Sequence, residues 1–180
     1  MKNNYLNLYF NKINSSLHSI DEKEFLKSVK LIKKLNKKNK IIFVGNGGSA
    51  SIANHCSTDF SKFLKKRSIT FNEPNLITCY ANDYGHENWM KEALRTHADS
   101  KDLLFLISSS GQSKNILNCA DQAKKMGLKI ITFSGFSHLN PLRKKGNLNF
   151  WLNCKNYNIV EMTHHIWILS ICDYILSSKF

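Results

Sequence analysis

Short apolar runs alternate with longer stretches in which apolar residues recur at helical spacing. Residues 41–44 are continuously apolar and are followed by a glycine-rich segment, 45–49. Residues 50–64 contain no glycine or proline and are apolar at every third or fourth position, which predicts a helix. A buried strand, a loop of small residues and a helix therefore follow one another here, and the same order recurs later in the chain.

Read in this way, the chain contains five strand-like runs separated by helical patterns. The runs lie at residues 41–44, 76–80, 102–107, 129–133 and 148–152, and helices are expected over 50–64, 86–97, 114–126 and 158–177. Residues 1–39 are expected to form two helices, the second with Asp21 as its N-cap and Glu24 three residues later. This alternation predicts an α/β fold with a parallel sheet covered on both faces.

Polar loops of small residues follow the first four predicted strands. They comprise residues 45–49, 82–85, 108–113 and 134–135. In open parallel sheets, ligands bind outside the carboxyl ends of the strands. We therefore expect these loops to converge on one site.

The first and third of these loops have the composition of an anion site. Glycine lets the backbone approach a ligand, and unpaired amides at a helix start favour negative charge. Serine hydroxyls in 108–113 could bind a phosphate without a charged side chain. Taken singly, each loop could also be a tight turn or a serine cap. Neither loop has the dinucleotide-binding or P-loop pattern.

Composition narrows the class of protein. The 180 residues are 42% hydrophobic and fit one domain, 1–180. No apolar run approaches the roughly 20 residues of a membrane span, so we expect a cytoplasmic protein without membrane contact.

Five scattered cysteines indicate reduced core thiols. The net charge of +13 suits an anionic ligand, but the lysine clusters lack interleaved aromatics, so nucleic acid is not expected as a partner.

Three motifs together resemble the phosphoheptose isomerase branch of the sugar isomerase (SIS) domain family. They are residues 45–49 followed by His55, residues 81–85, and residues 108–113, in that order and spacing. The resemblance implies a three-layer αβα sandwich with a five-stranded parallel sheet. It also implies a homotetramer, or a dimer, in which the N-terminal helices of residues 1–39 contribute to assembly and sites lie between subunits. The implied ligand is a phosphosugar, bound by Asn46, Gly47, Gly48, Ser49, Asn82, Asp83, Ser108, Ser109, Ser110 and Ser113.

The catalytic positions depart from the family pattern. Family members move a proton between C1 and C2 of sedoheptulose 7-phosphate, using a glutamate on the first site helix and a histidine on the last helix. The glutamate position is Asp59 here, and the histidine position falls on an apolar residue in either alignment register. The candidate acid/base groups are Asp59, Glu161, His164 and His165. The two histidines could instead be polar residues at a subunit contact.

Zinc is often bound near the site in the family, although the reaction requires no cofactor. Four residues of this chain could hold it if the first site helix and the last helix meet: His55, Asp59, Glu161 and His164.

Two functions follow from the resemblance. The first is an aldose/ketose phosphosugar isomerase in surface carbohydrate precursor synthesis, similar to sedoheptulose 7-phosphate isomerase. The second is a non-catalytic SIS module that binds a phosphosugar or a partner for regulation. Retention of His55 and of an acidic residue at position 59 favours the enzyme.

Overall fold

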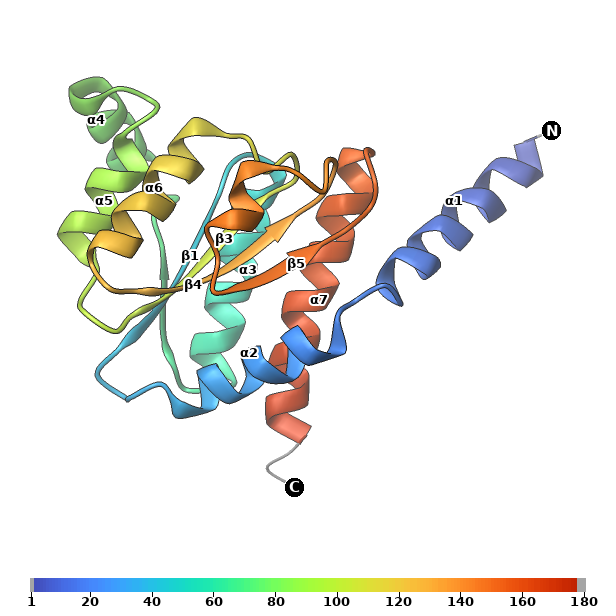
Figure 1. The fold of residues 1–180 in the computed structure, drawn as a ribbon, viewed down its shortest axis with the longest axis horizontal. Helices are drawn as coiled ribbons and strands as arrows, with labels where there is room; N and C mark the ends of the chain where they lie inside the picture. The colour runs from blue at the N-terminus through green and yellow to red at the C-terminus, as the bar shows by residue number, and fades with distance from the viewer. Residues whose placement is uncertain (1, 178–180) are drawn as a thin grey trace.

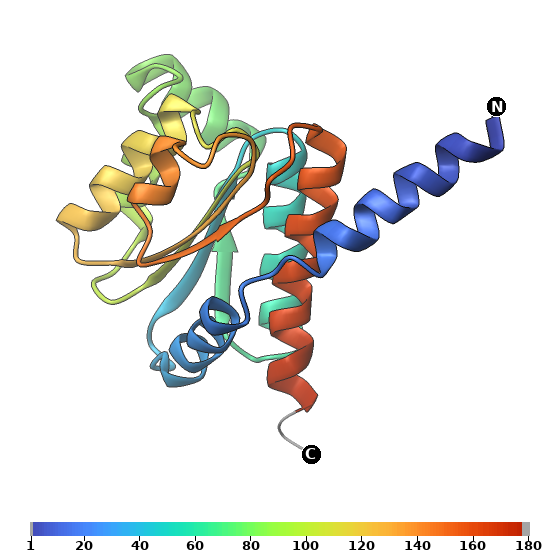
Figure 2. The ribbon, with the colours of Figure 1, turned by 45° about the vertical axis from the view of Figure 1, so that its right-hand side comes forward.

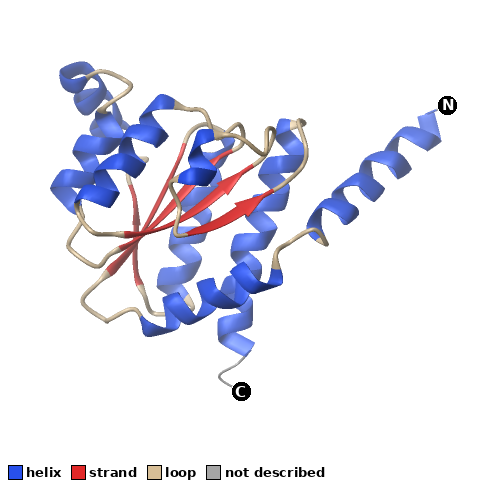
Figure 3. Ribbon diagram, in the orientation of Figure 1, coloured by secondary structure: helices blue, strands red, loops and turns tan. Residues whose placement is uncertain are grey.

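The computed structural model describes residues 2–177, which form a five-stranded parallel sheet between two layers of helices (Figures 1 and 3). The strand order is β2-β1-β3-β4-β5. The strands are β1 (Lys40–Gly45), β2 (Arg67–Thr70), β3 (Leu103–Ser108), β4 (Lys129–Ser134) and β5 (Leu148–Trp151). The predicted α/β class and parallel sheet are confirmed, and the strand predicted at 148–152 as an edge strand is β5, at one edge of the sheet.

Seven α-helices and one 3-10 helix accompany the sheet in the described part of the chain. They are α1 (Lys2–Leu17), α2 (Glu22–Lys34), α3 (Gly48–Lys62), α4 (Pro74–Tyr84), α5 (Trp89–His97), α6 (Lys114–Lys125), η1 (Pro141–Lys144) and α7 (Tyr157–Ser177). Asp21 caps α2 as predicted, with its carboxylate accepting from the N–H groups of Lys23 and Glu24. Glu24 does not complete a capping box, because its Oε2 accepts the N–H of Asn149 on the edge strand β5.

Successive residues of the central strands supply two separate cores. Ile41, Phe43 and Phe105 belong to the core under α2, α3 and α7, whereas Ile42 and Leu104 belong to the core under α5 and α6. Because side chains alternate across a strand, continuously apolar runs serve both faces. Figure 1 shows the two helical layers on either side of the sheet.

The predicted strand at 76–80 is wrong. These residues lie in α4, which begins at Pro74 and is capped by Glu73, whose Oε2 accepts the N–H of Leu76 at 2.8 Å. Proline suits the first turn of a helix because its missing N–H would have no partner there. The second strand is instead β2, a short polar edge strand beside β1. Residues 82–84, predicted to be part of a loop after a strand, instead form the last turn of α4, and Gly85 is its C-cap.

The last helix, α7, lies against α3 on one face of the sheet and also contacts α1 and α2 (Figure 2). Among the described residues it is the one helix long and apolar enough to cross a membrane by length and composition. Half of the tested window is buried inside the chain, which is typical of a core helix.

Candidate functional site

A small polar pocket opens at the carboxyl ends of β1 and β3, where the first and third predicted loops meet. Its volume is about 110 Å³. The lining residues are Asn46, Ser49, Ile107, Ser108, Ser109, Ser110, Ser113, Tyr157 and Glu161. Six of these nine were predicted to bind the ligand and Glu161 was predicted to be catalytic, so the structure brings the predicted loops together.

The first wall of the pocket is the start of α3. Gly47 has a φ of 53° and no side chain that could cap the helix, and Gly48 begins it. The first amides of α3 are therefore left for a ligand, and the helix dipole favours an anion beside them. Ser49, which is only 3% exposed, lines the pocket from the first turn.

The second wall runs from the end of β3 to the start of α6. The hydroxyls of Ser108 and Ser113 lie 3.5 Å apart, and Ser110 Oγ accepts the N–H of Gln112 at 3.2 Å. Ser113 is the N-cap of α6, but its side chain makes no capping bond. Its hydroxyl is therefore available to the pocket. Among the described residues, no lysine or arginine lines the pocket, so amides and hydroxyls supply its donors.

Glu161 on α7 is held close to both walls. Its Oε1 lies 3.4 Å from Ser109 Oγ, and a Cβ on Gly48 would lie 2.2 Å from its Oε2. Only glycine at position 48 leaves space for the carboxylate in this position. The arrangement places one acidic group beside a cluster of neutral hydrogen-bond donors.

A second group of titratable side chains lies farther along the contact between α3 and α7. His55 Nδ1 is 2.8 Å from His165 Nε2, and His55 Nε2 is 3.3 Å from Asp59 Oδ2. Burial, and then the neighbouring His55, lower the pKa of His165, while Asp59 raises it. The His55 ring contacts His165 through one nitrogen and Asp59 through the other, so the three side chains form one chain of contacts.

The two helices run in the same direction along this contact. Gly48 meets Glu161 near the first turns, and His55 meets His165 farther on. Four residues of α7 separate Glu161 from His165, which is about 6 Å along the helix axis. The pocket and the histidine pair therefore lie on one continuous line between α3 and α7.

His164 lies away from this line and does not have the surroundings of a catalytic base. It is fully buried against the rings of Phe133 and Trp167, and its Nε2 lies 3.1 Å from the carbonyl oxygen of Ser134. Burial lowers its pKa to about 4, so the ring is neutral near pH 7. Of the two candidate histidines, the structure places only His165 beside His55.

The predicted zinc ligands are divided among three places. His55 and Asp59 contact each other between turns of α3, Glu161 lies in the pocket, and His164 lies in the core. Within residues 2–177, no group of three or more His, Cys, Asp or Glu side chains is placed to hold a metal ion. The set that the sequence suggested is therefore not assembled within the chain.

Asn82 and Asp83 do not join the pocket either. They lie near the end of the exposed helix α4, and the Nδ2 of Asn82 donates to Asp83 Oδ1. Their predicted position rested on a strand at 76–80, and the helix found there directs them elsewhere. Two other residues were missed: Tyr157 lines the pocket, and Asn115 is bonded to Asn46. Neither stands in a motif that signals binding.

The fold and the paired loops define a SIS domain protein, and the chain belongs to the SIS domain family, whose model matches residues 8–135. Within that family the chain is similar to phosphoheptose isomerases. That of Helicobacter pylori strain Shi470 is 33% identical over 130 residues, covering 68% of this chain and 67% of the relative. That of Fusobacterium nucleatum is 34% identical over 124 residues, covering 64% of each chain.

Two solved structures share the fold over nearly the whole chain. Phosphoheptose isomerase GmhA from Neisseria gonorrhoeae has a TM-score of 0.86 at 21% identity, covering 98% of this chain and 100% of that one. The enzyme from Francisella tularensis has a TM-score of 0.85 at 22% identity, covering 98% and 99%. The family model ends before α7, so Glu161 and His165 lie outside the matched residues.

Proposed function

We propose that the protein is an aldose/ketose phosphosugar isomerase that acts on sedoheptulose 7-phosphate or a closely similar phosphosugar. The relatives named phosphoheptose isomerase support this substrate class. The observation that carries the proposal is the pocket itself, in which Glu161 faces serine hydroxyls and the free start of α3. Production of a surface carbohydrate precursor is the role that we expect for such a reaction.

The chemistry needs an anion site and a group that moves a proton. The phosphate would lie between Ser49 and the loop at 108–113, where amides and hydroxyls can donate to it. Glu161 would take a proton from one of the two carbons C1 and C2 and return it to the other, which converts aldose into ketose. The electron pair of the broken C–H bond forms the C1=C2 double bond of an enediol while the carbonyl oxygen takes up a proton. When the proton is delivered to the other carbon, the hydroxyl on the first carbon loses its proton and becomes the new carbonyl.

His165, His55 and Asp59 are the remaining proposed acid/base groups. They lie along α3 and α7 beyond Glu161, so a sugar chain leaving the pocket in that direction would reach them. An imidazole there could exchange a proton with a sugar oxygen while Asp59 orients the ring of His55. No step of the proposed reaction uses zinc, because the four predicted zinc ligands are not brought together within the described residues.

The direct test is an isomerisation assay on a panel of phosphosugars that includes sedoheptulose 7-phosphate. Glu161→Gln keeps the size of the side chain but removes the base, so we expect kcat to fall by at least 100-fold. Glu92→Gln on α5 is the matched control, because that carboxylate pairs with Arg95 away from the pocket. Asp59→Asn and His165→Gln test the second group.

The alternative is a phosphosugar-binding module without catalysis. It predicts tight binding of a phosphosugar, no turnover of any member of the panel, and loss of binding in Ser110→Ala plus Ser113→Ala. Unchanged turnover in Glu161→Gln would also refute the role that we give to this residue.

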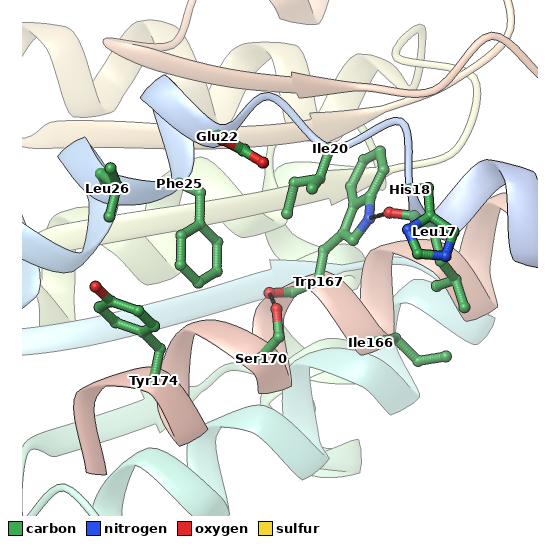
Figure 4. A pocket seen from close by; sticks show the side chains of 10 residues that line it. All are labelled: Leu17, His18, Ile20, Glu22, Phe25, Leu26, Ile166, Trp167, Ser170 and Tyr174. Atoms are coloured by element: carbon green, nitrogen blue, oxygen red, sulfur yellow. Dashed lines mark hydrogen bonds between the residues drawn. The ribbon is translucent and has the colours of Figure 1, made fainter. Parts of the chain in front are cut away.

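Assembly is a further part of the proposal, and we propose a homotetramer built from apolar surfaces that the single chain leaves open. Helix α1 projects from the body (Figures 1 and 2), and Tyr5, Leu6, Leu8 and Phe10 on it are 52–66% exposed. A largely apolar pocket of about 440 Å³ lies between the α1–α2 connection, α2 and α7 (Figure 4). Phe25, Ile166 and Trp167 are among its lining residues. Surfaces of this kind mark contacts between subunits.

The cytoplasm is the compartment that we propose. Cys56, Cys79, Cys119 and Cys154 are free thiols, and three of these four are buried. Free thiols are typical of a reducing compartment.

A further inference from the structure

Asn115 joins the two walls of the pocket without lining it. It lies in the first turn of α6 and is only 2% exposed. Its Nδ2 donates to Asn46 Oδ1 at 3.0 Å, and its Oδ1 accepts from Asn46 Nδ2 at 3.0 Å. A pair of reciprocal amide hydrogen bonds therefore ties the loop after β1 to the helix that begins at Ser113.

These bonds fix which way the Asn46 amide faces. Asn46 Oδ1 is used by Asn115, and so is one of the two hydrogens on Asn46 Nδ2. Asn115 Oδ1 also accepts the N–H of Ile116 at 3.0 Å, which opposes rotation of its own amide by 180°. The group that Asn46 still offers to the pocket is its second N–H, a donor suited to an anion.

We propose that Asn115 is a positioning residue that acts through Asn46. It holds the two loops in register and presents the Asn46 N–H to the anionic end of the ligand. This inference rests on the proposed function only in taking that anionic end to be a phosphate. It does not depend on whether the bound sugar is isomerised.

The test is a double-mutant cycle with Asn46→Ala, Asn115→Ala and the variant carrying both changes. Affinities for inorganic phosphate and sedoheptulose 7-phosphate are measured by calorimetry on the full chain. We expect each single change to weaken binding roughly ten- to hundredfold, the effect of losing a hydrogen bond to a charged group. Because Asn115 acts through Asn46, the double variant should bind about as weakly as Asn46→Ala alone.

Two variants guard against a merely structural effect. Asn118 lies one turn farther along α6, and its side chain donates to the carbonyl of Glu87. Asn118→Ala removes that hydrogen bond, so the affinity of this variant for both probes should stay within twofold of wild type. Asn115→Ser keeps a hydroxyl near Ile116 N–H but is too short to reach Asn46. It replaces Asn115→Ala if that variant does not fold. In turnover, Asn115 variants should raise KM with little change in kcat.

The outcomes separate this inference from the proposed function. Additive losses in the double variant, or wild-type affinity in the Asn115 variants, would overturn the positioning role while leaving the isomerase proposal standing. Non-additive losses without turnover would support the positioning role and overturn the isomerase. Absence of binding to either probe by the wild-type protein would overturn both.

Discussion

Gly48 has the most direct effect on the chemistry of the site, because it touches the proposed base without being a reactive residue itself. Its missing side chain leaves the space that the Glu161 carboxylate occupies. A residue that creates space for a neighbour does not stand out from sequence as catalytic. Its role becomes visible only when α7 is placed beside α3.

Gly48→Ala should therefore damage activity more than stability. The added methyl group would displace the end of the flexible Glu161 side chain, while alanine has the higher helix propensity. We expect the thermal midpoint to stay close to wild type and kcat to fall at least tenfold. The comparison is with Ser51→Ala, which is exposed on the same turn of α3. Equal activity in the two variants would contradict the contact.

His164 makes stability depend on pH. Its pKa is about 4 in the folded protein, below the ordinary value of 6.5. Below pH 6.5 the unfolded chain takes up a proton that the folded chain does not, so the free energy of unfolding falls between pH 6.5 and 4. The full loss is about 3 kcal/mol.

His164→Gln should remove this dependence while keeping a donor for the Ser134 carbonyl. Chemical unfolding of the wild type and of His164→Gln at several pH values measures how the free energy of unfolding of each protein depends on pH. The stability of wild type relative to the variant should fall as the pH drops from 6.5 to 4 and stay constant above 7. Parallel curves across this range would show that the folded protein protonates His164 normally.

At the scale of residues, the sequence identified most of the anion pocket and named both His164 and His165 as candidates, but it did not tell which of the two lies beside His55. Serine and glycine loops at strand ends are local signals, and those at 45–49 and 108–113 were placed correctly. His164 and His165 are adjacent on a helix, so they point about 100° apart. Which of them faces α3 depends on how α7 is rotated in the fold.

At the scale of elements, the apolar runs correctly predicted the parallel sheet and the helices that cover it. The one wrong element is the strand predicted at 76–80, which is helix α4. Helix α4 has no fully buried residue, but Leu76, Ile77, Tyr80 and Ala81 are partly buried against the core under α5 and α6, at helical spacing. Its run of β-branched and aromatic residues resembled a strand, while the actual edge strand β2 is partly polar because only one of its edges is paired. Pro74 after Glu73 was the local signal for a helix start.

The cap of α2 can be tested at this scale. Asp21 accepts two backbone N–H groups, at 2.9 and 3.0 Å, so Asp21→Ala should lower the free energy of unfolding by about 1 kcal/mol. Asp21→Asn keeps a side-chain oxygen that can accept these N–H groups, so this variant should retain most of the capping contribution to the free energy of unfolding. Urea unfolding at one fixed protein concentration measures both variants. A loss in Asp21→Asn as large as in Asp21→Ala would argue against a capping role.

At the scale of the whole molecule, charge and apolar surface serve different purposes. No lysine or arginine among the described residues lines the pocket, so the net charge of +13 makes no direct side-chain contact there. Among the described residues, seven of the twelve large exposed hydrophobic side chains lie on α1 or line the pocket of Figure 4. The total charge and the apolar content can be read from the composition. Where the charged and apolar side chains lie on the surface can be seen only from the folded structure.

The proposed assembly predicts a change in size when α1 is made polar. Leu6→Ser with Phe10→Ser replaces two side chains that are 52% and 59% exposed, so the isolated chain should fold as before. Light scattering on the eluting protein should show wild type at four times the mass of the chain and the variant below it. A wild-type monomer would contradict the assembly, and Lys12→Ser, a polar change on the same helix, serves as the control.

The most direct test of the central claim is hydrogen exchange at carbon during incubation of sedoheptulose 7-phosphate with the protein in D2O. A base that removes a proton from C1 or C2 lets solvent deuterium enter there, whether or not net conversion is large. The account predicts deuterium at these positions with the wild-type protein and a loss of at least 100-fold in rate with Glu161→Gln. Tight binding of the phosphosugar without any deuterium entering at C1 or C2 would contradict it.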